Sequence, residues 1–200
     1  MAPRLTYPEV PLPDRLTRKQ ATLPGKTQAV TLMGHPSITR RDPRYHAALI
    51  LNQVLGGDTL ASRLGTELRD RQGLTYGVYS FFNAGRDHGS FNVQMQTSAA
   101  DNAKAIEQAL ALIRQVQNEG VSAAEFSFAQ RDLINSFPVS LADPDSTARA
   151  ILGDELYGYP MGDFYRFPQR IQSVSQEETN RLSKELLRPD RLLVVTIKPE

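Results

Sequence analysis

An arginine and a tyrosine seven residues apart are the residues of this sequence best suited to chemistry. They are Arg69 and Tyr76, in the stretch LRDRQGLTYGVYS, residues 68–80. A guanidinium presents several donors in a fixed geometry and a phenol donates one hydrogen bond, so the pair could hold peptide carbonyls and a developing oxyanion. The structural alternative is that Arg69 meets the free carbonyls of a helix end, while Tyr76 packs its ring on a sheet with its hydroxyl in water.

The sequence lacks the patterns of the common self-sufficient catalytic centres. Its histidines, His35, His46 and His88, fit no zinc-ligand spacing, and a surface or packing role is expected for each. The stretch GGDTLASRLG has neither the lysine nor the strand context of a phosphate-binding loop. No serine stands in a nucleophile elbow, and the absence of cysteine excludes thiolate chemistry. We therefore expect no metal or cofactor site in this chain.

Glycines and prolines divide the segment before Arg69 into short elements. Residues 27–33 predict a strand that ends at Gly34 and Pro36. A helix is expected to open at Asp42, with proline in its first turn, and to stop at the glycine pair GG, where the backbone of another element can approach closely.

The elements around the arginine and the tyrosine are a short helix and a hairpin. Leucines at fourfold spacing predict a helix that carries Arg69 near its end and stops by Gly73; they are Leu60, Leu64 and Leu68. Residues 74–83 and 89–97 predict two strands joined by the loop NAGRDHG. The polar face of the second strand is typical of an antiparallel sheet that is covered on one side only.

The remainder of the chain is mostly helical. An apolar stripe over residues 106–116 predicts one helix, and Ser122 with Glu125 forms the capping box of the next. Further helices are expected to start at Asp143 and Ser175, before a closing strand over residues 192–197. The order of elements predicts an α+β fold of the split βαβ kind, with an antiparallel or mixed sheet covered on one face by helices.

The composition bounds the domain organisation and the partners. Residues 1–26 contain five prolines and predict an extended linker, and residues 27–200 predict one domain. A formal net charge of +1 is too small for the protein as a whole to attract nucleic acid or an anionic membrane. No apolar run is long enough to span a bilayer, and the N-terminus shows no signal-peptide core, so a soluble protein is expected, with a periplasmic or cytoplasmic location left open.

A longer run of residues resembles a known family. The run LNQVLGGDTLASRLGTELRDRQGLTYGVYSFF is similar to part of the non-zinc-binding, C-terminal domain of the M16 metallopeptidases, the pitrilysin, insulinase and mitochondrial processing peptidase family. The shared pattern is a leucine-rich helix, a glycine pair, SRL, LR, then GL and a tyrosine seven residues after the arginine. The later ELYGYP, a serine-capped helix and a hydrophobic last strand agree in kind and order, so the likeness covers about residues 26–200.

The resemblance implies a division of labour between two halves of a protease. Members pair a domain that carries the zinc motif HxxEH with a homologous domain that has lost it, and the two close like a clam shell around an unfolded peptide. This sequence lacks HxxEH. It therefore resembles the second half, as a separate subunit or as a C-terminal domain of a longer protease. Tyr76 and Arg69 match the tyrosine and arginine that this half contributes across the cleft to the oxyanion and a substrate carbonyl.

The resemblance implies no cofactor in this chain, zinc in the HxxEH-bearing partner domain or subunit, and a peptide or unfolded polypeptide as substrate. Two other hypotheses stay open. One is a non-catalytic scaffold, similar to the core subunits of respiratory complexes that share the fold. The other is a general peptide-binding domain that uses the exposed edge of its sheet.

Overall fold

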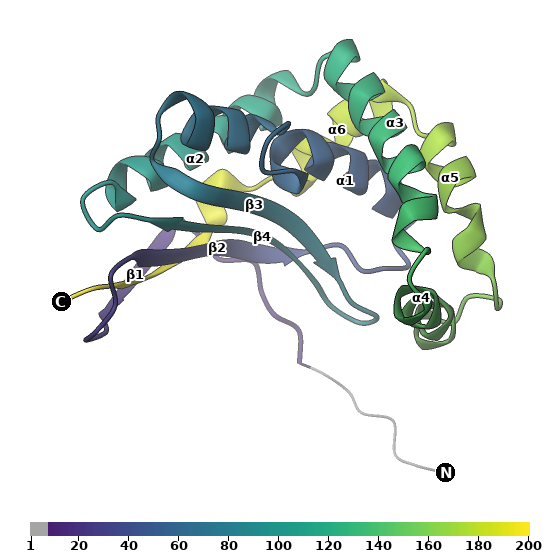
Figure 1. The fold of residues 1–200 in the computed structure, drawn as a ribbon, viewed down its shortest axis with the longest axis horizontal. Helices are drawn as coiled ribbons and strands as arrows, with labels where there is room; N and C mark the ends of the chain where they lie inside the picture. The colour runs from purple at the N-terminus through teal and green to yellow at the C-terminus, as the bar shows by residue number, and fades with distance from the viewer. Residues whose placement is uncertain (1–7) are drawn as a thin grey trace, which may run out of the picture.

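A five-stranded sheet with helices packed on one face forms the fold of residues 8–200, which the computed structural model describes (Figure 1). The strands are β1 (Thr17–Thr22), β2 (Ala29–Ser37), β3 (Thr75–Ala84), β4 (Gly89–Thr97) and β5 (Leu193–Lys198). The α-helices are α1 (Tyr45–Asn52), α2 (Asn102–Glu119), α3 (Ala123–Ser140), α4 (Pro144–Tyr157), α5 (Phe167–Ser173) and α6 (Gln176–Leu186). The π-helical segments are η1 (Gln53–Gly57) and η2 (Gly65–Arg71), and the 3₁₀ turns are η3 (Asp163–Arg166) and η4 (Pro189–Arg191). The predicted α+β class and one-sided helical cover are confirmed.

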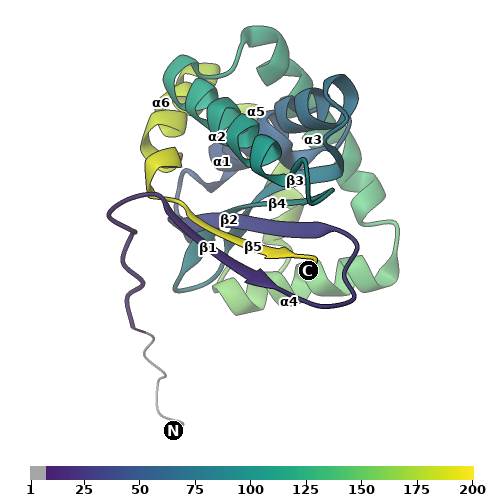
Figure 2. The ribbon, with the colours of Figure 1, turned by 90° about the vertical axis from the view of Figure 1, so that its left-hand side faces the viewer.

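The sheet is mixed and has the strand order β1-β5-β2-β4-β3. β1 runs parallel to β5, and the other three pairs are antiparallel. Figure 2 shows β5 lying between β1 and β2, with α1, α2, α3, α5 and α6 gathered above the sheet. The hairpin of β3 and β4 was predicted from its alternating residues, and the observed bounds of β4 coincide with the predicted ones.

β1 contradicts the prediction that residues 1–26 form an extended linker. Thr17–Thr22 pair with Leu193–Lys198 along the whole length of both strands. The segment contains no proline, so each of its backbone N–H groups is available to the sheet. Its side chains are mostly exposed, because it is an edge strand, and it therefore shows no apolar alternation. The prediction fails here because the strand depends on a distant partner. Residues 1–7 of the expected linker lie outside the described residues.

β2 continues through Gly34 and Pro36, where the sequence predicted its end. Its pairing with β5 ends at Gly34, while its pairing with β4 runs on to Ser37. Pro36 therefore lies where β2 has only one neighbour, and its missing N–H costs no hydrogen bond within the sheet. At Gly34 an added Cβ would lie 2.9 Å from the carbonyl oxygen of Phe91, so this position needs a glycine for close strand approach.

The hydrophobic core lies between the helices and the covered face of the sheet. Alternate residues of the hairpin point into it, and the predicted stripe of α2 packs against them. The fully buried members include Val78, Phe91, Val93, Ala109, Leu110 and Ile113. Burial of one such large side chain stabilises the fold by about 1.5–3 kcal/mol, so this layer fixes the register in which the strands present their other face.

Side-chain caps set the starts of three helices as the sequence predicted. The hydroxyl of Ser122 accepts from the N–H of Glu125, and the Glu125 carboxylate accepts from the N–H of Ser122 at 2.8 Å. The side chains of Asp143 and Ser175 accept from the N–H groups of Ser146 and Glu178, and so cap α4 and α6. The predicted leucine stripe is wrong at its first member, because Leu60 is 62% exposed in the turn before η2.

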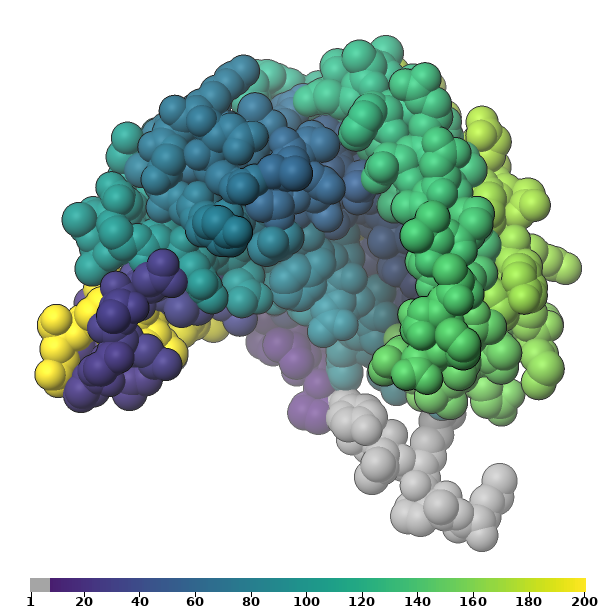
Figure 3. All heavy atoms as spheres, viewed as in Figure 1, coloured from purple at the N-terminus to yellow at the C-terminus, as the bar shows by residue number. Residues whose placement is uncertain are grey.

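The face of the sheet away from the helices is open and apolar in part. It carries exposed side chains at alternate positions of β2, β3 and β5; these are Leu32, Tyr79, Phe81, Leu193, Val195 and Ile197. Figure 3 shows the molecule hollowed on this side, between β1 and β5 at one end and α3 and α4 at the other. A groove of about 1040 Å³ lies here, partly bounded by residues 9–11. Among residues 8–200, none of the helices combines the length and apolar composition that a bilayer span requires.

Candidate active site

Arg69 lies in the last turn of η2, and the backbone beyond it closes the helix. Gly73 has φ +61° and its N–H donates to the carbonyl of Arg69 at 3.1 Å. The N–H of Leu74 donates to the carbonyl of Leu68 at 2.8 Å. These backbone bonds satisfy helix-end carbonyls that the alternative interpretation assigned to the Arg69 side chain. The guanidinium is therefore available for another partner.

Tyr76 lies on a β-bulge at the start of β3. The register with β4 shifts between Thr75 and Gly77, so Tyr76 is the additional residue. The hydroxyl of Thr75 holds this turn, because it accepts from the N–H of Gly77 at 3.1 Å and lies within hydrogen-bonding distance of the Gln96 carbonyl. A bulge redirects the side chain of its extra residue, and Tyr76 is 84% exposed. Its ring therefore does not pack on the sheet.

The structure brings the arginine and the tyrosine together. The Cζ atom of Arg69 lies 5.5 Å from the centre of the Tyr76 ring, within the range of a cation–π contact. The nearest carboxylate to the guanidinium is that of Asp70, at 3.9 Å, which is a loose ion pair. The Arg69 side chain is 29% exposed. The pair thus presents a phenol hydroxyl and guanidinium donors on one exposed surface.

Two glycines hold the segments that position this pair. A Cβ on Gly56 would lie 2.8 Å from the backbone nitrogen of Ser80 in β3, and a Cβ on Gly65 would lie 1.9 Å from the carbonyl oxygen of Thr59. The hydroxyl of Ser80 also donates to the side-chain oxygen of Asn52 at 2.8 Å. The close backbone approach expected at the glycine pair is therefore present, and it fixes η1 against the strand that carries Tyr76.

A partly buried arginine, Arg63, for which the sequence predicted no role, ties the same region to α3. The Arg63 guanidinium donates two hydrogen bonds to the Glu125 carboxylate, at 2.7 and 2.8 Å, and a third to the carbonyl of Gly120 at 3.1 Å. The hydrogen bonds from Arg63, supported by those from Ser122, lower the pKa of Glu125 to about 2. Such a paired arrangement is structural, because it leaves few donors of Arg63 unused.

The described residues offer no fit to a zinc ion. No group of three or more histidine, cysteine, aspartate or glutamate side chains within residues 8–200 is placed to hold a metal. His35 is buried, its Nδ1 lies 2.8 Å from the carbonyl oxygen of Pro36, and burial lowers its pKa. Burial, followed by the charges of Arg170 and Arg40, lowers the pKa of His46 to about 4. Neither histidine stands in a metal-ligand set.

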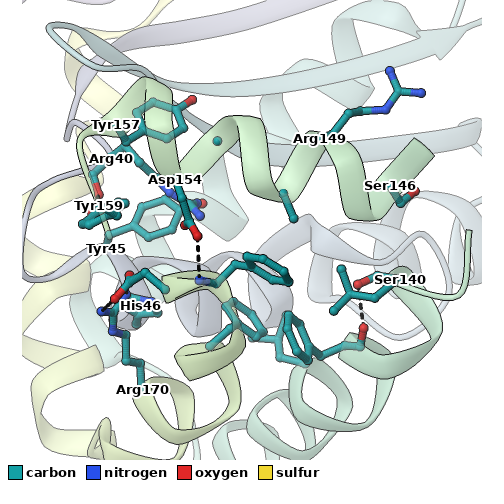
Figure 4. Close-up of a pocket in the computed structure, with 18 of the residues that line it drawn as sticks. Arg40, Tyr45, His46, Ser140, Ser146, Arg149, Asp154, Tyr157, Tyr159 and Arg170 are labelled. Carbon is teal, nitrogen blue, oxygen red and sulfur yellow. Dashed lines mark hydrogen bonds and ion pairs between the residues drawn. The ribbon is translucent and has the colours of Figure 1, made fainter. Parts of the chain in front are cut away.

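A cavity of about 440 Å³ among α1, α3, α4 and α5 is the feature that the sequence analysis missed (Figure 4). Arg40, Tyr45 and Tyr157 meet at one end of it. Arg40 and Tyr157 are more than a hundred residues apart in the chain, and no local pattern relates them. Neither Arg69 nor Tyr76 lines this cavity.

Comparison with known proteins gives the family of the chain. The family model described as the peptidase M16 inactive domain matches residues 3–133, well over half of the chain. The uncharacterized zinc protease YmxG of Bacillus subtilis is 25% identical over 182 residues, which cover 91% of this chain and 43% of that protein. A peptidase M16 inactive domain from Pseudomonas fluorescens has a TM-score of 0.87 and 26% identity, with 100% of this chain and 47% of that chain covered.

A more distant likeness shows the fold alone. A chain of complex III from Candida albicans has a TM-score of 0.76 at 12% identity, with 92% of this chain and 45% of that chain covered. The present chain spans 43% of the length of the Bacillus subtilis relative, which is less than half. The resemblance found in the run around Arg69 and Tyr76 is confirmed at the level of the family. The chain belongs to the peptidase M16 inactive-domain family.

Proposed function

We propose that this chain is the substrate-binding, non-zinc half of an M16 zinc metalloendopeptidase, acting with a domain or subunit that carries HxxEH. The observation that carries the proposal is the approach of Arg69 to Tyr76, with the tyrosine turned outward by the bulge. A residue with only a packing role has no need of an 84% exposed ring. The zinc protease names of the relatives support the same reaction class.

The two side chains would act on the substrate across the cleft. The hydroxyl of Tyr76 would donate a hydrogen bond to the oxyanion that develops on the scissile carbonyl, and Arg69 would hold a neighbouring peptide carbonyl or steady the tyrosine. In such an enzyme the HxxEH-bearing half would hold the zinc, which would supply activation of the attacking water. Nothing in the described residues of this chain holds that metal.

The open face of the sheet supports the assignment of a polypeptide substrate. Its exposed apolar side chains and the groove of about 1040 Å³ face the same side of the molecule. An extended peptide buries apolar side chains at alternate positions, so such a face suits an unfolded segment better than a folded protein surface. In a clam-shell enzyme this face would form part of the inner wall.

The test for Tyr76 is its replacement by phenylalanine in the protease reconstituted with its zinc-bearing half. Loss of one oxyanion donor costs on the order of a hundredfold in turnover, and we expect that loss with unchanged folding and zinc content. Tyr165→Phe is the control, because Tyr165 is 61% exposed, lies in η3 and belongs neither to the open face nor to the Arg69–Tyr76 pair. Ordinary turnover of Tyr76→Phe would remove the oxyanion assignment.

The test for Arg69 compares it with an arginine of the same helical segment. Arg69→Ala should lower turnover about as much as Tyr76→Phe, whereas Arg71→Ala should not, because Arg71 is 71% exposed and pairs with Glu67 of its own helical segment. Thermal unfolding of both variants separates the two roles. A change confined to melting temperature in Arg69→Ala would favour the helix-end interpretation.

The protein alone provides a second measurement. We expect the isolated chain to bind no stoichiometric zinc and to hydrolyse no peptide, and the pair with its HxxEH-bearing partner to show hydrolysis that a chelator abolishes. Stoichiometric zinc or hydrolysis in the isolated chain contradicts the proposal.

The second candidate is a non-catalytic scaffold, favoured by the likeness to a chain of complex III. Under this function Arg69 and Tyr76 would contribute only to structure. Substitution of either residue would then leave the activity of any assembly unchanged, which the assays above distinguish.

A further inference from the structure

The cavity among α1, α3, α4 and α5 has the character of a ligand site that is separate from the Arg69–Tyr76 pair. Its volume of about 440 Å³ lies within the range of small-molecule pockets, about 300–1,000 Å³. We propose that it binds a small apolar carboxylate, with the carboxylate on Arg40 and the apolar body against a group of phenylalanines. This proposal does not rest on the protease function.

Arg40 is a preorganised anion receptor at one end of the cavity. Its Cζ atom lies 4.2 Å from the centre of the Tyr45 ring and 5.5 Å from that of Tyr157. Its backbone is also held, because the hydroxyl of Tyr159 donates to its carbonyl at 2.9 Å. A guanidinium stacked on rings can present N–H donors of its edge to a carboxylate. No carboxylate of residues 8–200 forms an ion pair with the Arg40 guanidinium within 4.0 Å.

The charges around the cavity leave an excess of positive potential. Three arginines and two aspartates line it. Asp163 is matched by Arg170, with contacts of 2.7 and 2.8 Å, which leaves Arg40 and Arg149 against Asp154. The half-buried His46 adds no charge near neutral pH, because burial and the nearby guanidinium groups lower its pKa to about 4. An anion therefore improves the electrostatic balance of the site.

The middle of the cavity is suited to an apolar body. The rings of Phe137 and Phe167 stack with centroids 5.2 Å apart, and Phe164 lines the same space. In Figure 4 Arg40 and Tyr45 lie at one end, while Ser140, Ser146 and Arg149 lie at the other. The site therefore combines one strong polar anchor with an aromatic wall, which is the usual composition of a small-molecule pocket.

Two sources could supply this chemistry, a free small acid or the C-terminal carboxylate of a peptide that ends in an apolar residue. The probes are 3-phenylpropionate, its neutral amide 3-phenylpropanamide, and an acetylated tripeptide ending in phenylalanine as free acid or as carboxamide. Isothermal titration calorimetry with the whole chain measures each. Binding of the free tripeptide acid indicates a chain end, and binding of 3-phenylpropionate alone indicates a small acid.

The expected result is binding of 3-phenylpropionate with a dissociation constant of about a millimolar or lower, and no binding of either amide. Arg40→Gln should weaken binding about tenfold or more, because a charge-assisted bidentate contact is lost. Arg41→Gln is the control, since Arg41 is exposed, adjacent in sequence and outside the lining. Binding should also raise the pKa of His46, which the imidazole NMR signals report.

A second variant tests the site without removing the arginine. Gly153 lines the cavity and has no heavy atom within 4 Å of an added Cβ, so Gly153→Leu should fill the space and abolish binding. Absence of 3-phenylpropionate binding by the unmodified chain overturns the proposal. So does equal binding of the acid and its amide, or undiminished binding by both Arg40→Gln and Gly153→Leu.

Discussion

Gly73 forms the turn between η2 and β3, and its replacement by alanine isolates the cost of that backbone conformation. Its φ is +61°, and no heavy atom lies within 4 Å of an added Cβ, so Gly73→Ala creates no clash. The left-handed conformation costs alanine about 1–2 kcal/mol. Alanine also lowers the conformational entropy of the unfolded chain, which stabilises the folded state by about 0.4–1 kcal/mol. The free energy of unfolding should therefore fall by about 1 kcal/mol, equivalent to a melting temperature about 2–4 °C lower in a chain of this size.

Gly153→Ala is the matched substitution, and it is expected to raise the free energy of unfolding. Gly153 lies inside α4, and an added Cβ there also meets nothing within 4 Å. Alanine in a helix interior is favoured over glycine by about 0.5–1 kcal/mol, so this variant should be more stable than the unmodified chain. Urea unfolding followed by circular dichroism measures both, with unchanged m-values as the check on two-state behaviour. A Gly73→Ala variant as stable as the unmodified chain would refute the assigned role of the turn.

Three further predictions concern packing, capping and pH. Gly65→Ala should lower the free energy of unfolding by several times as much as Gly73→Ala, because the added Cβ would lie 1.9 Å from the Thr59 carbonyl oxygen. A decrease below about 1 kcal/mol in urea unfolding would contradict this. Ser122→Ala should cost about 1 kcal/mol through loss of the α3 cap, and Ser122→Thr should restore most of it in the same assay. The pKa of His46 is about 4 in the folded chain and 6.5 in the unfolded chain. Between these pH values the unfolded chain binds more protons, so the free energy of unfolding should fall as the pH drops from about 6.5 to about 4. Solvent screening of the partly exposed ring reduces the effect to about 1–2 kcal/mol, and a His46→Gln variant with an unchanged pH slope of unfolding would be evidence against it.

The parts of the fold that depend on local chemistry could be predicted from the sequence. The capping box at Ser122, the start of α4 at Asp143 and the stop at Gly73 each need only neighbouring residues. The hairpin was predictable because one face of it is buried, which imposes alternation. β1 has no buried face, and α5 is a seven-residue helix with a single buried residue, so neither leaves a periodic signal.

The candidate site also has features that depend on neighbouring residues and features that depend on distant ones. A helix end, a glycine turn and a strand start bring Arg69 and Tyr76 together over seven residues, so their adjacency followed from the order of local elements. The bulge that exposes Tyr76 depends on Thr75 and its partner strand, and the sequence alone did not indicate it. The cavity at Arg40 joins segments that meet only in three dimensions, and their partners could not be read from spacing.

The place of β5 between β1 and β2 has a consequence for synthesis of the chain. Among the five strands of this sheet β1 leaves the ribosome before the others, yet its pairing partner, residues 193–198, is the last of the five to be made. At about 5–20 residues per second, residues 17–22 wait roughly ten to thirty seconds without that partner. The hairpin and β2 can pair during this interval, because their contacts need no later residues. Sheet assembly therefore ends with the insertion of β5 between β1 and β2. Until then β1 has no partner in the sheet, which makes it the strand most open to proteolysis or mispairing during translation.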